Sequence, residues 1–184
     1  VAVPLPLAGI DDRGGHRVRA VAPAPAAPRP RLGKLCVAIQ ASTPAEMWSR
    51  AAAAAEDTRF IEFRLDTLPK PAAALPGLQE FLSRHRDLSS IVTCRRKHSG
   101  GKFSGSLTAE LDILLKAAEA GCSIVDLEVE SAEEAKPSQL AKFRAALRAA
   151  GAALLISFQD FTLTNGLEQA SDRGGAFEPE FIKV

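Results

Sequence analysis

From Lys34 onward, short apolar runs alternate with longer stretches that are rich in alanine and leucine. The short runs carry branched residues and have the length of strands, whereas the longer stretches have the apolar spacing of helices. A strand followed by a helix recurs about every 30 residues, which is the length of a βα unit. The pattern therefore predicts a parallel sheet whose strands begin near Leu35, Arg59, Ser89, Cys122, Ala152 and Glu180.

Three of the predicted helices carry boundary signals. Thr43-Pro44-Ala45-Glu46 combines a capping threonine with a proline in the first turn, and Ser106-Leu107-Thr108-Ala109-Glu110 is a second capping arrangement. Ser138–Ala150 is amphipathic and is followed by Gly151, the residue type that most often ends a helix. These boundaries support the alternation of strands and helices.

Two architectures fit this α/β pattern. A (β/α)8 TIM barrel needs roughly 250 residues, so residues 34–184 would form a partial barrel of about five βα units and the start of a sixth strand. An open doubly wound sheet fits the same residues with no missing strands. Length alone does not separate the two.

Charged residues at the ends of the predicted strands favour the barrel. Glu62, Arg64 and Asp66 recur with a period of two and therefore share one face of their strand. A strand in a parallel sheet is normally apolar on both faces, so three charges on one face indicate a polar cavity rather than a solvated edge. Further polar groups close the later strands, in Thr93-Cys94-Arg95-Arg96, in Asp126 and Glu128, and in Ser157-Phe158-Gln159-Asp160-Phe161. Polar groups from four strands that meet at one end have the layout of a barrel mouth.

The first 33 residues differ from the rest of the chain. Residues 22–31 are rich in proline and alanine, so we expect residues 1–33 to be an extended, disordered tail and residues 34–184 to be the folded domain. The tail resembles an organelle transit peptide in its arginines and alanines, but Asp11, Asp12 and the prolines oppose an amphipathic helix. We interpret it as an upstream leader or the product of a misplaced start.

Composition and charge narrow the range of partners. The net charge is +1 and no apolar run reaches the length of about 18 residues that a membrane span requires, so neither nucleic acid nor membrane is an expected partner. The expected partner is a small molecule. The three cysteines, Cys36, Cys94 and Cys122, are far apart and lie in or beside apolar runs. We expect them to be reduced core residues of a cytoplasmic protein, not disulfides or metal ligands.

The chain ends on Phe181-Ile182-Lys183-Val184, which reads as the opening of a buried strand. Because a strand at the edge of a sheet leaves backbone groups unpaired, we expect the sequence to be either a fragment or a shortened protein. Lys183 is the best candidate for chemistry, since an amine within an apolar strand is placed to act as a nucleophile.

Taken in order, five of these segments resemble type I 3-dehydroquinate dehydratase, over the chain from about Lys34 to its last residue. They are Glu62-Phe63-Arg64-Leu65-Asp66, Thr93-Cys94-Arg95 followed by Gly100-Gly101, Val125-Asp126-Leu127-Glu128, Ser157-Phe158-Gln159-Asp160-Phe161, and Phe181-Ile182-Lys183-Val184. The resemblance implies a (β/α)8 barrel, usually a homodimer, that converts 3-dehydroquinate to 3-dehydroshikimate in the shikimate pathway. It implies no metal and no cofactor.

The resemblance also assigns roles to residues. Lys183 would attack the substrate ketone and form a Schiff base, an electron sink for loss of the neighbouring proton. The attack needs a neutral amine, which burial or nearby cations such as Arg64 and Arg95 would favour. Glu62, Arg64 and Arg95 would hydrogen-bond the hydroxyls of the substrate ring. The alternative for these three is a salt-bridge network that closes the barrel mouth, and Asp66, Asp126 and Glu128 are expected to have structural roles.

Gln159 departs from the family pattern. The family has its general acid/base histidine there, and glutamine has no proton to exchange near neutral pH. An ungapped count from Arg95 places Ser99 where the family has the glutamate that orients this histidine. Neighbouring His98 is an alternative base, although a loop histidine is more often solvated. The glycine-rich segment 99–105 is a candidate for a flexible lid.

The family's last two strands supply an arginine for the substrate carboxylate and a serine and a glutamine on a closing loop, and those positions are absent. We therefore expect activity to be impaired. Two other functions remain open: another class I Schiff-base aldolase or lyase barrel, and a non-catalytic binder of sugar acids.

Overall fold

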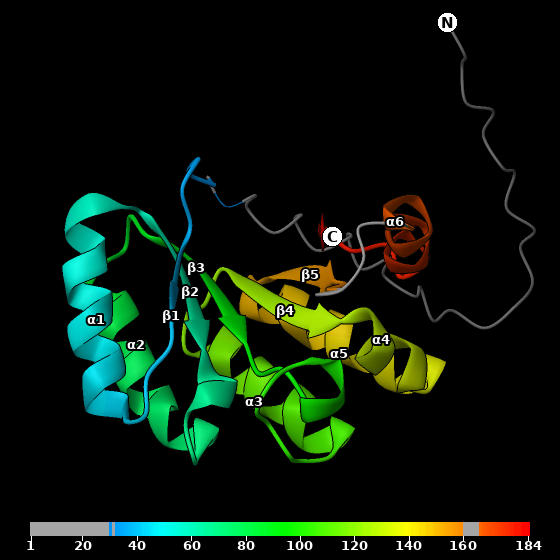
Figure 1. Cartoon of the computed structure of the whole chain (residues 1–184), viewed down its shortest axis with the longest axis horizontal. Helices are drawn as coiled ribbons and strands as arrows, with labels where there is room; N and C mark the ends of the chain where they lie inside the picture. Colours follow the sequence, from blue (N-terminus) through cyan, green and yellow to red (C-terminus); the bar gives the residue numbers. More distant parts are fainter. Residues whose placement is uncertain (1–29, 31, 160–165) are drawn as a thin grey trace, which may run out of the picture.

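The computed structural model describes residues 30, 32–159 and 166–184, and these residues alternate between strands and helices along the chain (Figure 1). The strands are β1 (Val37–Ile39), β2 (Phe60–Arg64), β3 (Ser89–Thr93), β4 (Ile124–Glu128), β5 (Ala153–Ser157) and β6 (Phe181–Lys183). The α-helices are α1 (Pro44–Asp57), α2 (Leu75–Arg84), α3 (Leu107–Glu119), α4 (Val129–Glu134), α5 (Pro137–Ala150) and α6 (Leu167–Gly175). Each strand begins within two residues of its predicted start.

The predicted helix boundaries have a physical basis in the structure. Thr43 caps α1 by accepting a hydrogen bond from the backbone of Glu46, and the Glu46 carboxylate accepts one from the backbone of Ser42. Ser106 caps α3 in the same way. Helix α5 ends at Gly151, whose φ of 77° lies in the left-handed region that favours glycine.

The six strands form one parallel sheet in the order β1-β2-β3-β4-β5-β6. A doubly wound sheet reverses its strand order at a switch point, whereas a barrel adds each new strand beside the last. The sequential order therefore decides for the barrel, of which six consecutive strands are described. Helix α1 packs at the β1–β2 side and α6 beside β6 at the other side (Figure 1).

Each strand divides its residues between two faces. The outer face packs under the helices in the larger core, to which Ile61, Phe63, Val92, Val125, Leu127, Leu154 and Ile156 belong. The inner face begins with a smaller apolar cluster of Phe60, Ile91, Ile124, Ala153 and Leu155. Towards the carboxyl ends of the strands the inner face becomes polar, which places the candidate chemistry there.

Most of the predicted tail lies outside the described residues, as do Asp160 and Phe161 of the fifth-strand segment. Within the described ranges, no helix combines the length and apolar character needed to cross a bilayer.

Candidate active site

Strand register sets the height of the polar side chains on the inner face. Thr93 pairs with Asp126 across β3 and β4, and Glu128 pairs with Ser157, which in turn pairs with Lys183. Because the strands are parallel, their carboxyl ends meet at one rim of the sheet. Residues from five strands are thus brought together, although the two that lie farthest apart in the chain, Glu62 and Lys183, are 121 positions apart.

The amine of Lys183 lies between two carboxylates. Its Nζ is 2.8 Å from Asp126 Oδ2 and 3.6 Å from Glu62 Oε1, and its side chain is 31% exposed. Thr93 links the two acids, since its hydroxyl is 2.7 Å from Glu62 Oε1 and 3.3 Å from Asp126 Oδ2. The direct partners of the amine are thus two anions, whereas the sequence analysis considered burial or nearby cations such as Arg64 and Arg95 as its surroundings.

Arg95 is the most deeply buried cation of the site, with 1% of its side chain exposed. Its guanidinium donates to Glu128 Oε1 at 2.9 Å, to Ser157 Oγ at 3.1 Å and to the side-chain oxygen of Gln159. Its Nη2 is also 3.6 Å from Asp126 Oδ2. Asp126 Oδ2 therefore joins Lys183 and Arg95 into one charged network.

Arg64 forms a fork with Asp66, with N–O distances of 2.9 Å for both hydrogen bonds. This pairing, followed by the Coulombic pull of Asp66 and Glu62, raises the pKa of the Arg64 guanidinium against the opposing effect of burial. Asp66 is itself buried and accepts a hydrogen bond from the backbone of Lys102. Arg64 is thus held at the rim, beside the other site residues.

The segment after β3 is hydrogen-bonded to the residues that directly follow the strand, and its role as a flexible lid stays a prediction. The backbone of Phe103 donates to the carbonyl of Arg95, and the backbone of Gly101 donates to that of Arg96. A Cβ at Gly101 would clash with the Arg95 carbonyl, so glycine permits this close approach. The segment packs against the backbone of Arg95 and hydrogen-bonds its carbonyl.

Gln159 and His98 occupy different surroundings. Gln159 is exposed and accepts from Arg95, so it lies at the site. His98 is also exposed, and the carboxylate on which its charge acts is Glu134. No hydrogen bond or ion pair joins His98 to Lys183 within the described residues. Ser99, counted as the orienting position, has a buried hydroxyl without a hydrogen-bond partner among the described residues.

The cysteines are free, as expected, and their burial differs. Cys94 and Cys122 are buried and Cys36 is partly buried. Burial raises the pKa of the Cys122 thiol to about 11. Burial, aided by the charge of Glu62, raises that of Cys36 to about 11 as well. All three are therefore thiols near neutral pH.

Sequence reasoning missed a second buried group behind the site. Arg96 turns away from Lys183 and contacts Glu110 on α3, with Ser131 and Glu134 on α4. Glu110 was interpreted as part of a helix cap, yet it is fully buried. The available signal was its position on α3 in the stripe of buried Leu107, Leu111 and Leu114.

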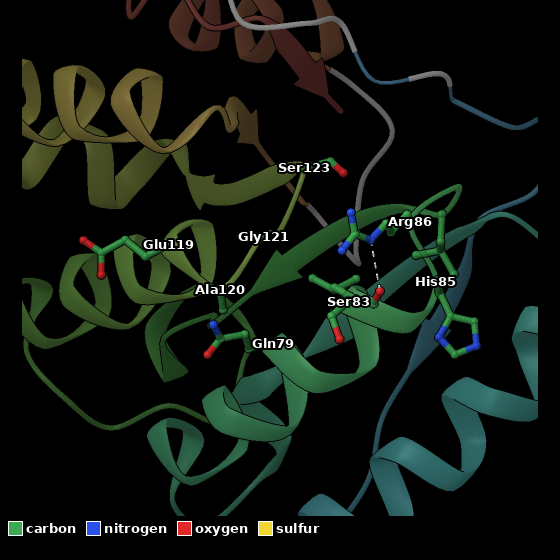
Figure 2. Close-up of a pocket in the computed structure, with 10 residues that line it drawn as sticks. Gln79, Ser83, His85, Arg86, Glu119, Ala120, Gly121 and Ser123 are labelled. Atoms are coloured by element: carbon green, nitrogen blue, oxygen red, sulfur yellow. Dashed lines mark hydrogen bonds between the residues drawn. The ribbon is translucent and has the colours of Figure 1, made fainter.

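A separate pocket lies at the other end of the strands (Figure 2). It has a volume of about 420 Å³ and is lined by Gln79, Leu82, Ser83, His85, Arg86, Leu88, Glu119, Ala120, Gly121 and Ser123. Leu88 and Ser123 directly precede β3 and β4, so the pocket opens at the amino ends of these strands. Barrel enzymes use the carboxyl ends for catalysis.

Curated relatives of this chain carry the name 3-dehydroquinate dehydratase. The Desulfotalea psychrophila protein is 33% identical over 122 residues, which cover 62% of this chain and 49% of that protein. The Coxiella burnetii protein is 28% identical over 101 residues, which cover 55% of this chain and 42% of that protein. The matched part thus spans about half the length of these relatives.

Solved structures share the fold of this chain, and a family model matches its sequence. The 3-dehydroquinate dehydratase of Enterococcus faecalis superposes with a TM-score of 0.67 at 19% identity and covers 81% of this chain and 64% of that chain. The type I enzyme of Clostridium difficile gives 0.62 at 18% identity, over 73% of this chain and 54% of that chain. The model of the type I 3-dehydroquinase family matches residues 35–184. The chain therefore belongs to the type I 3-dehydroquinase family.

Proposed function

We propose that this chain carries the Schiff-base site of a 3-dehydroquinate dehydratase, a lyase that converts 3-dehydroquinate to 3-dehydroshikimate in the shikimate pathway. The observation that carries the proposal is the position of Lys183. Its amine lies at the carboxyl end of a barrel strand, 2.8 Å from Asp126 and 3.6 Å from Glu62. Family membership supplies the substrate class.

The first step is formation of the imine. Asp126 Oδ2 is the nearest acceptor for a proton of the Lys183 ammonium, and the neutral amine then attacks the ketone carbon of the substrate. The ketone oxygen leaves as water. The protonated imine next receives the electron pair released when the adjacent C–H bond breaks, and the proton passes to solvent water because Gln159 cannot accept it. Return of the electron pair breaks the bond to the hydroxyl, which takes up a proton from solvent and leaves as a second water. Hydrolysis of the imine consumes one water and restores the lysine, so the net change is loss of one water.

Glu62, Arg64 and Arg95 are the proposed binding groups for the substrate hydroxyls. All three lie around the rim, and each has an oppositely charged partner: Lys183 for Glu62, Asp66 for Arg64 and Glu128 for Arg95. Such pairing orients the side chains before a ligand arrives. The lysine serves as the electron sink, so the proposed chemistry uses no metal and no cofactor.

Gln159 sets the expected limit of this activity. It hydrogen-bonds Arg95 and has no titratable proton, so it orients the arginine but does not transfer a proton. Lack of a general acid/base group typically costs about 10² to 10⁴ in rate. We propose an impaired dehydratase that still forms the imine on Lys183 although glutamine, not histidine, stands at position 159. By analogy with the family, the proposal extends to a homodimer in the cytoplasm.

Borohydride trapping tests the proposal. The chain is incubated with 3-dehydroquinate and sodium borohydride, and the modified peptide is located by mass spectrometry. We expect a reduced adduct on Lys183, no adduct in Lys183→Met, and an unchanged adduct in Lys102→Met, a matched control on the exposed part of the segment after β3. Absence of the adduct in the unmodified chain, or its persistence in Lys183→Met, overturns the proposed function.

The second candidate is a non-catalytic binder of the same sugar acid. The bond from Arg95 to Gln159 favours it, because a site without a general base retains its binding groups. Calorimetry with 3-dehydroquinate separates the two: a binder shows saturable heat without a borohydride adduct.

A further inference from the structure

A buried carboxyl behind the site has no role in the proposed chemistry. Glu110 on α3 is 0% exposed and lies among Arg96, Ser131 and Glu128. Its Oε2 accepts from the Ser131 hydroxyl at 2.9 Å and lies 3.0 Å from Arg96 Nε. Its Oε1 is buried and receives no hydrogen bond from any described residue.

The unpartnered Oε1 of Glu110 indicates that the carboxyl group is protonated at this oxygen. An ionised Glu110 would leave Oε1 buried without a donor and would place a second negative charge beside Glu128, both of which are costly away from water. A neutral acid carries a hydrogen and needs an acceptor. The carboxylate of Glu128 lies on the same Ser131 hydroxyl as Glu110, with Glu128 Oε2 3.4 Å from that hydroxyl oxygen, and its proximity raises the pKa of Glu110. The same Glu128 accepts from Arg95 at 2.9 Å.

We propose that Glu110 is a positioning residue, a neutral carboxylic acid whose Oε1 hydrogen is donated to Glu128 and which thereby holds Glu128 against Arg95. The acid supplies a donor without a charge, so Glu128 keeps its full negative charge for the guanidinium. The part that concerns substrate binding by Arg95 rests on the proposed function. The protonation state of Glu110 does not.

Several charged and titratable groups face Glu110. Arg96 follows β3 and opposes the protonation, Glu128 on β4 favours it, and the Cys94 thiol at the end of β3 is neutral. Glu134 on α4 lies on the other side of Arg96 and forms an ion pair with it, with 2.6 Å between Arg96 Nη2 and Glu134 Oε2. No ion pair or hydrogen bond links Glu110 to α2 or α5 in the described part of the chain. Burial, with the contact to Glu128, raises the pKa of Glu110 to about 9.

The pH dependence of stability has a definite sign. Because the pKa of Glu110 is higher in the folded chain than in the unfolded chain, its contribution is fully present below pH 4.5 and is lost progressively as pH rises towards 9. Glu110→Gln keeps a donor and an acceptor and does not titrate. Between about pH 5 and 8 the folding equilibrium should therefore shift in favour of the variant by up to tenfold per pH unit.

Urea unfolding of the unmodified 184-residue chain and of Glu110→Gln at pH 5, 6, 7 and 8 tests the proton. Glu133→Gln is the matched control: hydrogen bonding to Arg173, away from Glu110, lowers the pKa of Glu133, so its difference from the unmodified chain should be constant over this range. A constant difference for Glu110→Gln would overturn the proposal. If that variant does not fold, carbon-13 NMR of the unmodified chain replaces it. One glutamate carboxyl that titrates above pH 7 supports a neutral Glu110, and none overturns it.

The positioning role has its own test. In the borohydride reaction, Glu110→Gln should trap 3-dehydroquinate with nearly the affinity of the unmodified chain, while Glu110→Ala should require roughly tenfold more substrate, the effect of about one hydrogen bond to a charged group. Equal affinities for both variants would overturn the positioning role. If the unmodified chain forms no adduct, the proposed function fails, and the unfolding experiment still decides the state of Glu110.

Discussion

The two ends of the inner sheet face are made by the same strands and have opposite character. The amino end is apolar, and two positions further along β2, β3, β4, β5 and β6 the residue is polar. The pairs are Phe60 and Glu62, Ile91 and Thr93, Ile124 and Asp126, Leu155 and Ser157, and Phe181 and Lys183. Because side chains two apart share a face, each pair stands on the same side of its strand. A distance of two residues along a strand therefore separates the packed apolar positions from the polar positions of the candidate site.

The difference shows how charges are kept at the rim of a packed interior. At the amino end, close-packed apolar groups exclude water and stabilise the sheet. At the carboxyl end, buried charges are compensated by one another, as Asp126 is by Lys183 and Arg95. A buried ion pair adds little net stability, but loss of one partner is costly. Substitutions at the two ends should therefore separate stability from activity.

The largest expected effect is an increase in the dehydration rate after a substitution at the polar end. Gln159→His introduces the missing general base next to Arg95, so dehydration of 3-dehydroquinate should accelerate by about 10² to 10⁴. The rate should rise with pH through the usual histidine pKa of about 6.5. Steady-state absorbance of the product measures it, with Gln159→Ala as the control. An unchanged rate would mean that position 159 does not face the reacting carbon or that another base already acts.

Arg95→Met should produce the largest loss of stability at the polar end. It removes the cation from Glu128 and leaves Asp126 with one cationic partner fewer, so the free energy of unfolding should fall by about 3–5 kcal/mol. Urea unfolding measures the change. Glu128→Gln with Arg95→Met in the same chain should recover part of it. No recovery would show that packing rather than charge sets the cost.

Ile124→Ala tests the apolar end. Ile124 is fully buried in the inner cluster, and its truncation should lower the free energy of unfolding by about 2–5 kcal/mol through lost burial and the cavity left behind. In conditions where the variant is folded, borohydride trapping on Lys183 should be unchanged. Loss of trapping in a folded variant would show that the two ends of the face do not act separately.

Thr93→Val should have the smallest effect of the four. It removes the hydroxyl between Glu62 and Asp126 with little change of shape, so stability should fall by about 1–3 kcal/mol. Because the hydroxyl orients the acids around Lys183, trapping of 3-dehydroquinate should also slow. Thr93→Ser keeps the hydroxyl and should trap at the original rate. If valine and serine behave alike, the hydroxyl does not orient the site.

Much of the local structure follows from the sequence for physical reasons. Caps at Thr43 and Ser106 and the glycine after α5 are local signals, because a few neighbouring residues satisfy the helix ends. The period of two along β2 and β4 correctly predicts a polar rim, but Asp66 lies beyond β2 in the 3-10 turn Leu65–Thr67 and not on the strand. Glu110 shows the limit, because a carboxyl in the first turn of a helix is as typical of an exposed cap as of a buried acid, and only packing against β4 distinguishes them.

The sequence by itself determined the alternation of strands and helices, the faces of the strands and the family to which its motifs belong. Tertiary structure alone decided the strand order and the partners of each charge. Periodicity states which way a side chain points but not what lies beside it, since neighbouring strands are about 30 residues apart in the chain. Only the register of the sheet brings Lys183 to Asp126 and Arg95 to Glu128, and it places the carboxylates of Asp126 and Glu62 against the amine of Lys183.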